Sequence, residues 1–242
     1  MIYVVGIGPG SKEMMTLQAI EALKKADVIV GYKTYVDLVT EFCQGKEVVV
    51  NGMRGEVERC KEAIEIAKST NKDVAVISSG DAGVYGMAGL ILELMSEEAE
   101  KVEVKVVPGV TASLGAASIL GAPMMHDFCH ISLSDLLTPW EVIERRLKAA
   151  GQGDFIVCLY NPRSKGRKGH LERAFEILKE DKNASTVVGI VKNVGREKEE
   201  KHITTLEDID FEMVDMTTIV IVGNNGTFEH EGKMITPRGY KI

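Results

Sequence analysis

Residues 4–16 read VVGIGPGSKEMMT, an apolar run that ends in three glycines and a proline before a helical pattern begins. A strand, a glycine-rich turn and a helix in this order are typical of nucleotide-binding α/β proteins. A dinucleotide site is disfavoured here, because Ser11 stands in place of the third glycine and Gly31 in place of the ribose-binding acid. Pro9 also removes a backbone donor from the loop. The stretch therefore predicts a strand-end loop that serves another ligand.

Outward from this loop, the first half of the chain alternates between apolar runs and amphipathic helical patterns. These predict strands at 2–8, 27–31, 47–50, 73–78 and 102–109, and helices at 17–25, 34–42, 56–69 and 84–95. Thr16 is the expected N-cap of the first helix. Continuous apolar strands that alternate with helices predict a mostly parallel sheet covered on both faces.

The pattern changes near residues 119–130, where Gly121 and Pro123 interrupt it. Beyond them we expect strands at 129–135, 154–161, 185–194, 201–206 and 217–223, and helices at 139–150 and 171–179. Thr138 is the expected cap of the 139–150 helix, with Pro139 in its first position. Short strands in succession predict an α+β domain with antiparallel pairing. The chain is therefore predicted to be an α/β protein of two domains, 1–119 and 120–242.

The composition is that of an ordinary globular protein, with 242 residues, 45% hydrophobic and 27% charged. Four widely spaced cysteines predict free thiols in a reducing cytoplasm, and the strand directly after Met1 leaves no room for a signal peptide. A net charge of −7 without a long basic stripe disfavours nucleic acid as a partner. No apolar run reaches the ~18 residues of a membrane span. We expect a cytoplasmic protein that binds neither nucleic acid nor membrane.

Two more glycine loops follow predicted strands. The second loop is SSGDAGVYGMAG (78–89), and the third is VVPGVTASLGAAS (106–118), in which Thr111 is a candidate helix cap. Asp81 is the one acid of the second loop, and it either caps the next helix or faces a cationic group of a ligand. Because all three loops follow strands of one parallel sheet, they predict a crevice for a flat or extended ligand.

In combination, these loops resemble the motifs of the tetrapyrrole methylases. The matching segments are Gly6-x-Gly8-Pro9-Gly10, Ser79-Gly80-Asp81 and Pro108-Gly109-Val110-Thr111-Ala112. The sequence departs from the family in one place, with Ala82 where a proline usually follows the aspartate. The resemblance covers essentially the whole chain. It implies a two-domain fold, with an N-terminal mostly parallel sheet with helices, a C-terminal mixed α+β domain and an active-site cleft between them.

Within that family, three further segments are similar to one branch. They are MHDFCHISLSDLLTPWEVIERRL (125–147), LYNPRSKGR (159–167) and TPRGY (236–240). The branch methylates C-17 of precorrin-3B or of cobalt-factor III in cobalamin biosynthesis, and the resemblance implies that methylation is coupled to ring contraction.

The resemblance also implies S-adenosylmethionine as the cofactor, bound between the domains and released as S-adenosylhomocysteine. The positions that match cofactor-binding residues are Pro9, Ser79, Gly80, Asp81, Val84, Thr111, Ala112, Tyr160 and Val194. Neutral glycine loops suit this ligand better than a pyrophosphate, because its methionine end is zwitterionic and its adenosine is apolar. Relatives of this kind are homodimers, which implies a homodimer here.

A tetrapyrrole substrate carries several carboxylates, so an acidic protein must offer local positive charge. NPRSKGRKGH (161–170) supplies it, and we predict that Arg163, Lys165 and Arg167 bind substrate carboxylates. Arg54 is a second candidate, and Ser11 is a candidate contact for the edge of the substrate. The alternative is that 161–170 is a solvated surface loop.

HDFCH (126–130) contains the candidate proton-transfer groups. His126 or His130 fits that role because histidine titrates near neutral pH, and Asp81 is a third candidate. The alternative is a hydrogen-bonded linker histidine. A zinc site is disfavoured because no second ligand pair at zinc spacing is present, and no metal is expected.

Two rival functions stay open at this stage. One is a methylase of the same family that acts at another ring position or on another acceptor, such as a protein histidine or ribosomal RNA. The other is a non-catalytic module that binds a nucleotide or a corrinoid.

Overall fold

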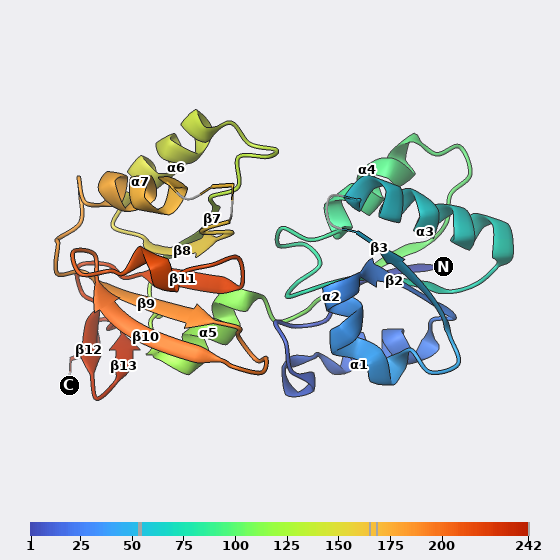
Figure 1. Cartoon of the computed structure of the whole chain (residues 1–242), viewed down its shortest axis with the longest axis horizontal. Coiled ribbons are helices and arrows are strands. Elements are labelled where there is room, and N and C mark those ends of the chain that lie inside the picture. Colours follow the sequence, from blue (N-terminus) through green and yellow to red (C-terminus); the bar gives the residue numbers. More distant parts are fainter. Residues whose placement is uncertain (53–54, 165, 168, 242) are drawn as a thin grey trace. The chain divides into compact units, whose positions relative to one another are not determined.

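A computed structural model describes residues 1–52, 55–164, 166–167 and 169–241. Contacts divide the chain into two compact units, Met1–Ala112 and Ser113–Ile242 (Figure 1). Helix α5 (Ala112–Leu120) therefore groups with the second unit from its second residue onward, whereas the boundary expected from the sequence lies after residue 119. Close packing accounts for this grouping, because a Cβ on Gly189 would lie 2.5 Å from a Cδ atom of Leu120.

The first unit is built on five parallel strands, as the alternating pattern predicts. They stand in the order β3-β2-β4-β1-β5, with bounds β1 (Ile2–Gly6), β2 (Val28–Tyr32), β3 (Glu47–Asn51), β4 (Val74–Ser78) and β5 (Val104–Val107). β1 lies between β4 and β5, with Gly6 opposite Ser78 and Val5 opposite Val107. The carboxyl ends of these three strands share one edge of the sheet, so the three glycine loops begin side by side.

Helices cover both faces of this sheet (Figure 1). They are α1 (Leu17–Lys25), α2 (Lys33–Val36), α3 (Glu56–Thr70) and α4 (Ala88–Glu97). Alternate residues of each strand enter opposite cores, so that Ile2 and Val4 pack with α3 and α4 while Tyr3 and Val5 pack with α1 and α2. In the part of the chain that the structure describes, no helix is long and apolar enough to cross a membrane.

The helix starts of the first unit differ in how well the sequence predicts them. α1 begins after Thr16, whose Oγ1 accepts the N–H of Ala19 at 3.0 Å, as expected. The 34–42 segment is instead one α-helical turn followed by the 3-10 helix η2 (Asp37–Phe42), with a break at Val39. α4 begins at Ala88 rather than at residue 84, because the preceding turn closes with an Ala88 N–H to Ala82 O bond of 2.9 Å.

The second unit is the mixed α+β domain that the sequence predicts. Its main sheet has the order β10-β9-β11-β8-β7, antiparallel except for the parallel pair β7–β8, with bounds β7 (Phe128–Ser132), β8 (Ile156–Tyr160), β9 (Val187–Lys192), β10 (Glu200–Thr205) and β11 (Thr218–Val222). The unit also contains a small sheet that the sequence did not predict. It consists of β6 (Gly121–Ala122), β12 (Phe228–His230) and β13 (Lys233–Ile235).

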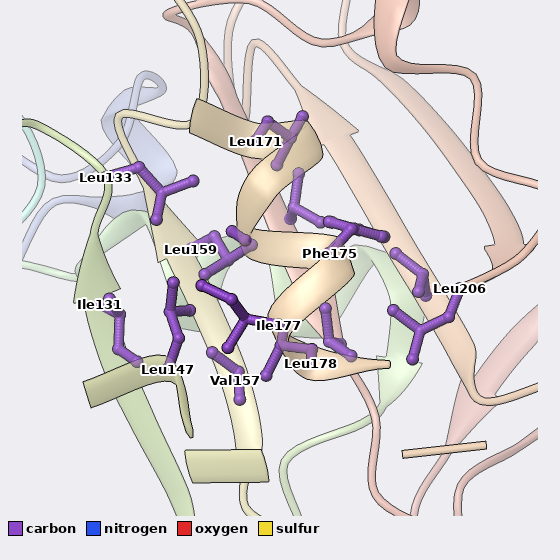
Figure 2. Packing of buried hydrophobic residues seen from close by; sticks show 14 of the residues in the cluster. Ile131, Leu133, Leu147, Val157, Leu159, Leu171, Phe175, Ile177, Leu178 and Leu206 are labelled. Atoms are coloured by element: carbon purple, nitrogen blue, oxygen red, sulfur yellow. The ribbon is translucent and has the colours of Figure 1, made fainter. Parts of the chain in front are cut away.

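Two helices, α6 (Trp140–Gln152) and α7 (Gly169–Leu178), enclose the core of this unit. Figure 2 shows side chains of α7, such as Phe175 and Leu178, in the same cluster as Val157 and Leu159 of β8. The prediction that Thr138 caps α6 is wrong. Pro139 is the N-cap, since its ψ of 141° is extended and the helix can begin only after it.

Candidate functional site

The three glycine loops of the first unit meet in a backbone contact formed by Gly6, Gly8, Gly80 and Gly109, here termed the glycine crossing. The N–H of Gly8 donates to the carbonyl of Gly80 at 3.1 Å, and the N–H of Gly80 donates back at 2.7 Å. Both residues have positive φ, 74° for Gly8 and 70° for Gly80, which side-chain-bearing residues rarely adopt. The loops converge as the sequence predicts, and the first and second loops are joined here through main chain alone.

Gly6 and Gly109 have a different requirement, which is space. A Cβ on Gly109 would lie 2.2 Å from the carbonyl oxygen of Gly80 and 2.6 Å from that of Gly6. A Cβ on Gly6 would lie 2.7 Å from the nitrogen of Gly109. The first and third loops can therefore approach this closely only without side chains at these two positions.

Asp81 ties the second loop to the third. Its Oδ1 accepts the N–H of Gly83 at 2.8 Å, and its Oδ2 accepts the N–H of Gly109 at 2.9 Å. It does not cap α4, whose N-cap is Met87, so that alternative from the sequence is wrong. Both carboxylate oxygens serve backbone donors, which makes Asp81 a positioning residue for the loops.

The other cofactor candidates of the first unit are Pro9, Ser79, Gly80, Val84, Thr111 and Ala112, none of which carries a charge. Thr16 joins the first loop to the third by donating its Oγ1 hydrogen to the carbonyl of Pro108 at 3.0 Å. Ser11, the candidate substrate contact, is half-buried at the start of η1 (Lys12–Met14). The candidate cofactor contacts of this unit are therefore uncharged apart from Asp81.

A side-chain cluster in the second unit joins Ser113, His130 and Tyr160. The N–H of Ser113, in the first turn of α5, donates to Tyr160 Oη at 3.0 Å, and Ser113 Oγ lies 2.9 Å from His130 Nε2. The rings of His130 and Tyr160 are adjacent, with centroids 5.1 Å apart. Burial lowers the pKa of His130, which keeps its imidazole neutral near pH 7 and able to accept a proton.

His126 lies in a different environment. It is exposed, its Nδ1 accepts the N–H of Asp127 at 3.0 Å, and it lies 3.6 Å from the carboxylate of the same residue. Within the described ranges, no three His, Cys, Asp or Glu side chains gather as metal ligands. Of the two candidate histidines, His130 is therefore the one in a partly buried polar cluster. Val194, the last cofactor candidate, is buried just after β9.

The two described arginines of the basic loop point into the protein. Arg163 donates to the carbonyl of Phe211 at 2.5 Å, and its Nη2 lies 2.5 Å from Glu212 and 3.8 Å from Glu172. Arg167 donates to the carbonyls of Leu133 at 2.9 Å and Asn161 at 3.3 Å.

These contacts fold the loop back onto its own unit. Two other basic residues singled out from the sequence, Arg54 and Lys165, lie outside the described residues. His170, at the end of the same loop, stacks on Trp140 with ring centroids 4.2 Å apart.

Sequence reasoning missed Ser113. It directly follows the Thr111-Ala112 motif, so its position near the site could have been inferred. Nothing in the sequence distinguishes it from the other small residues of the same helix. Its partners His130 and Tyr160 come from two neighbouring strands, and only the parallel pairing of β7 with β8 brings them together.

Known proteins are similar to this chain in both sequence and fold. The family model described as Tetrapyrrole (Corrin/Porphyrin) Methylases matches residues 1–210. The probable cobalt-factor III C(17)-methyltransferase of Salmonella typhimurium is 62% identical over 242 residues, covering 100% of both chains. The precorrin-3B C(17)-methyltransferase of Sinorhizobium sp is 40% identical over 99% of this chain and 96% of that protein. A crystal structure of the methyltransferase CobJ matches with a TM-score of 0.91 and 37% identity, covering 98% of this chain and 99% of that one.

Proposed function

Because the chain belongs to the tetrapyrrole (corrin/porphyrin) methylases, we propose that it is an S-adenosylmethionine-dependent C-methyltransferase of cobalamin biosynthesis. Its reaction is methylation of C-17 of a corrin precursor, coupled to ring contraction. The observation that carries this proposal is the 62% identity, over the full length of both chains, to a protein named for C(17) methylation of cobalt-factor III. Identity to the precorrin-3B enzyme is 40%, which favours cobalt-factor III as the substrate.

The residues around the glycine crossing fit S-adenosylmethionine. A pyrophosphate would need cationic or amide donors, whereas the cofactor candidates here include no cation, Pro9 has no N–H, and Asp81, the acid of the second loop, already accepts from two backbone donors. Such a surface suits an apolar adenosine and a zwitterionic methionine end. The residues proposed to hold the cofactor in the first unit are Pro9, Ser79, Gly80, Val84, Thr111 and Ala112, with Asp81 fixing the loops. Tyr160 and Val194 are the candidates in the second unit.

The bound cofactor supplies a methyl group on a sulfonium sulfur. Transfer to carbon is an in-line displacement, so the chain contributes orientation and a dry site rather than a nucleophile. Rigid loops serve that purpose, and the glycine crossing makes them rigid through backbone bonds. His130, kept neutral by burial and bonded to Ser113, is the proposed proton acceptor. His126 is the weaker candidate because it is exposed.

Substrate carboxylates are proposed to meet Arg163, Arg167, Lys165 and Arg54, with Ser11 at the substrate edge. For Arg163 this requires an exchange of partners. Its side chain is 9% exposed and paired with Glu212, whose side chain is 81% exposed. A substrate carboxylate can replace Glu212 without leaving a buried charge unpaired, since the released glutamate returns to water.

A cytoplasmic homodimer completes the proposal. The homodimer is implied by the resemblance to the family, and four free cysteines are consistent with a reducing compartment. Light scattering coupled to size-exclusion chromatography measures the oligomeric state, and cell fractionation tests the cytoplasmic location.

Product analysis tests the reaction. The purified protein is incubated with methyl-labelled S-adenosylmethionine and, separately, with cobalt-factor III and precorrin-3B. We expect one added labelled methyl group by mass spectrometry and its assignment to C-17 by NMR, with faster turnover of cobalt-factor III. A methyl group at another ring carbon would show that the chain is a different methylase of the same family.

Ligand binding separates the enzyme from a nucleotide-binding module. A ligand that binds the native state raises its stability by RT ln(1 + [L]/Kd), so only the true ligand shifts the melting temperature. S-adenosylhomocysteine should raise it, whereas NAD and ATP at the same concentration should not. Stabilisation by NAD alone would contradict the proposed function.

A further inference from the structure

Arg59, in the first turns of α3, is a buried cation without an acidic partner among the described residues. Its exposed fraction is 4%, and the acceptors that its guanidinium contacts there are the carbonyl of Gly52 and the sulfur of Met87. Neither acceptor is an anion. Buried arginines are ordinarily paired with a carboxylate or a phosphate, because an unpaired charge is costly to remove from water. The charge of Arg59 is therefore uncompensated within the part of the chain that the structure describes.

One edge of the guanidinium is only half used. Nη2 donates to the carbonyl of Gly52 at 3.1 Å, and Nη1 lies 3.8 Å from Met87 Sδ, a weak acceptor. Nε has no hydrogen-bond partner, and it is the one nitrogen among the buried, unpartnered side-chain atoms of the described residues. Nε and Nη2 share the edge with which arginine binds a carboxylate through two parallel bonds. Half of this edge is empty, and a neutral carbonyl occupies the other half.

The loop over this edge leaves room for a ligand. Gly52 is exposed, and a Cβ on it would meet nothing within 4 Å. A carboxylate that enters beside Gly52 can take the Nη2 donor from the carbonyl and meet Nε at the same time. The released carbonyl returns to water, so the exchange leaves no polar group buried without a partner. Glu56 and Glu58 of the first turn of α3 are exposed, so water and salt screen their repulsion of the entering anion.

The position in the sheet indicates which ligand this is. Gly52 follows β3, and Met87 is the N-cap of α4 at the end of the second glycine loop, so Arg59 lies at the carboxyl edge, where open α/β sheets bind ligands. The residues proposed for the cofactor in this unit follow β1, β4 and β5, whereas β3 is two strand spacings from β4, roughly 10 Å. A carboxylate at Arg59 therefore fits the larger ligand, whose carboxylates lie on its rim.

Resting on the proposed function, we propose that Arg59 binds a rim carboxylate of the tetrapyrrole substrate through Nε and Nη2 and contributes to specificity for it. A protein of net charge −7 needs local cations to hold a polycarboxylate. Arg163 and Arg167, which the sequence predicts for this role, already have partners within their own unit. Arg59 has an unused donor, and its pairing with a substrate carboxylate compensates a charge that is otherwise buried alone.

Two substitutions of Arg59 test this contact. Arg59→Met fills similar space without a charge, and because it removes a buried cation that has no acidic partner, it should melt at or above the wild-type temperature. We expect its KM for cobalt-factor III to rise about 10- to 100-fold, the loss typical of a hydrogen-bonded charge, whereas its KM for S-adenosylmethionine stays within about twofold. Arg59→Lys keeps the charge but not the planar fork, so its KM for cobalt-factor III should lie between those of the wild type and Arg59→Met. Lys61→Met removes one positive charge from an exposed position of the same helix and should change neither KM.

The outcomes separate this contact from a structural role and from the proposed function. A wild-type KM for cobalt-factor III in Arg59→Met overturns the contact and leaves the proposed function standing. A lower melting temperature with both KM values unchanged assigns Arg59 to holding the loop after β3, and a rise in the KM for S-adenosylmethionine alone assigns it to the cofactor; either result overturns the contact with the substrate. If Arg59→Met does not fold, an unchanged KM for cobalt-factor III in Arg59→Lys overturns the contact and a raised one supports it. Absence of methylated product from the wild-type chain overturns the proposed function and this contact with it.

Discussion

Replacing Gly109 by alanine would insert a methyl group into the glycine crossing. The new Cβ would lie 2.2 Å from the carbonyl oxygen of Gly80 and 2.6 Å from that of Gly6, and both are backbone atoms that no rotamer change can move. Relief requires the loops to separate. Separation disrupts the two bonds between Gly8 and Gly80 and the bond from Gly109 to Asp81, three hydrogen bonds in all.

The expected loss of stability follows from these contacts. Three hydrogen bonds at about 1 kcal/mol each, with about 1 kcal/mol or more for residual overpacking, lower the free energy of unfolding by roughly 4 kcal/mol. For a chain of this size, each kcal/mol shifts the melting temperature by about 2–4 °C, so Gly109→Ala should melt roughly 10 °C or more below wild type. Differential scanning fluorimetry measures the shift, and a second scan with S-adenosylhomocysteine should show reduced ligand stabilisation.

Gly89→Ala is the matched control for this experiment. Gly89 lies in the first turn of α4, and a Cβ there would meet nothing within 4 Å. Alanine is favoured over glycine in helices by roughly 0.5–1 kcal/mol, so this variant should melt at or above the wild-type temperature. If Gly109→Ala also melted at the wild-type temperature and bound S-adenosylhomocysteine normally, the crossing would not hold the loops together as argued.

Three further predictions concern the second unit and the thiols. Burial holds the pKa of His130 below its ordinary value of 6.5, so the unfolded chain takes up the proton first and stability falls as the pH drops below about 6.5. His130→Asn should flatten that part of the pH profile in urea unfolding, and an unchanged slope would assign it to other groups. Ser113→Ala removes the hydrogen bond to His130 but keeps the backbone donor to Tyr160, so it should cost about 1 kcal/mol and slow turnover, with Ser113→Thr restoring both. Among the thiols, burial raises the pKa of Cys158, whereas Cys43 is partly exposed. Iodoacetamide should therefore label Cys43 well before Cys158 in the native protein, as measured by peptide mass spectrometry. Equal labelling of the two cysteines would mean that the second unit opens readily.

Local chemistry explains which elements the sequence predicts well. Helix α1 begins and ends where the sequence indicates, because Thr16 is a cap whose acceptor reaches Ala19 within the same turn. The start of α4 was predicted four residues too early, at 84 rather than Ala88. The apolar pattern there continues through a turn whose shape depends on Gly86 and on an anchor in another loop, neither of which periodicity reports.

The candidate site likewise combines features that local sequence predicts with features that depend on distant residues. The glycine positions are visible in the sequence, and their placement after strands predicts that the loops share an edge. Their separate roles are not visible, since Gly8 needs its backbone angle, Gly109 needs space, and Gly89 needs neither. Each role depends on atoms contributed by a distant loop. The inward direction of Arg163 is hidden for the same reason, because Glu212 is far away in the sequence.

Asp81 shows why a charged residue stands in an otherwise neutral loop. One of its oxygens opens the turn that follows it through Gly83, and the other closes the crossing through Gly109. Asparagine at this position has one acceptor oxygen, so its NH₂ group would face either the N–H of Gly83 or that of Gly109, donor against donor. A carboxylate is the side chain of this length that accepts from both. The charge is therefore explained by two backbone donors, and the same residue joins the second and third loops, both of which are proposed to hold the cofactor.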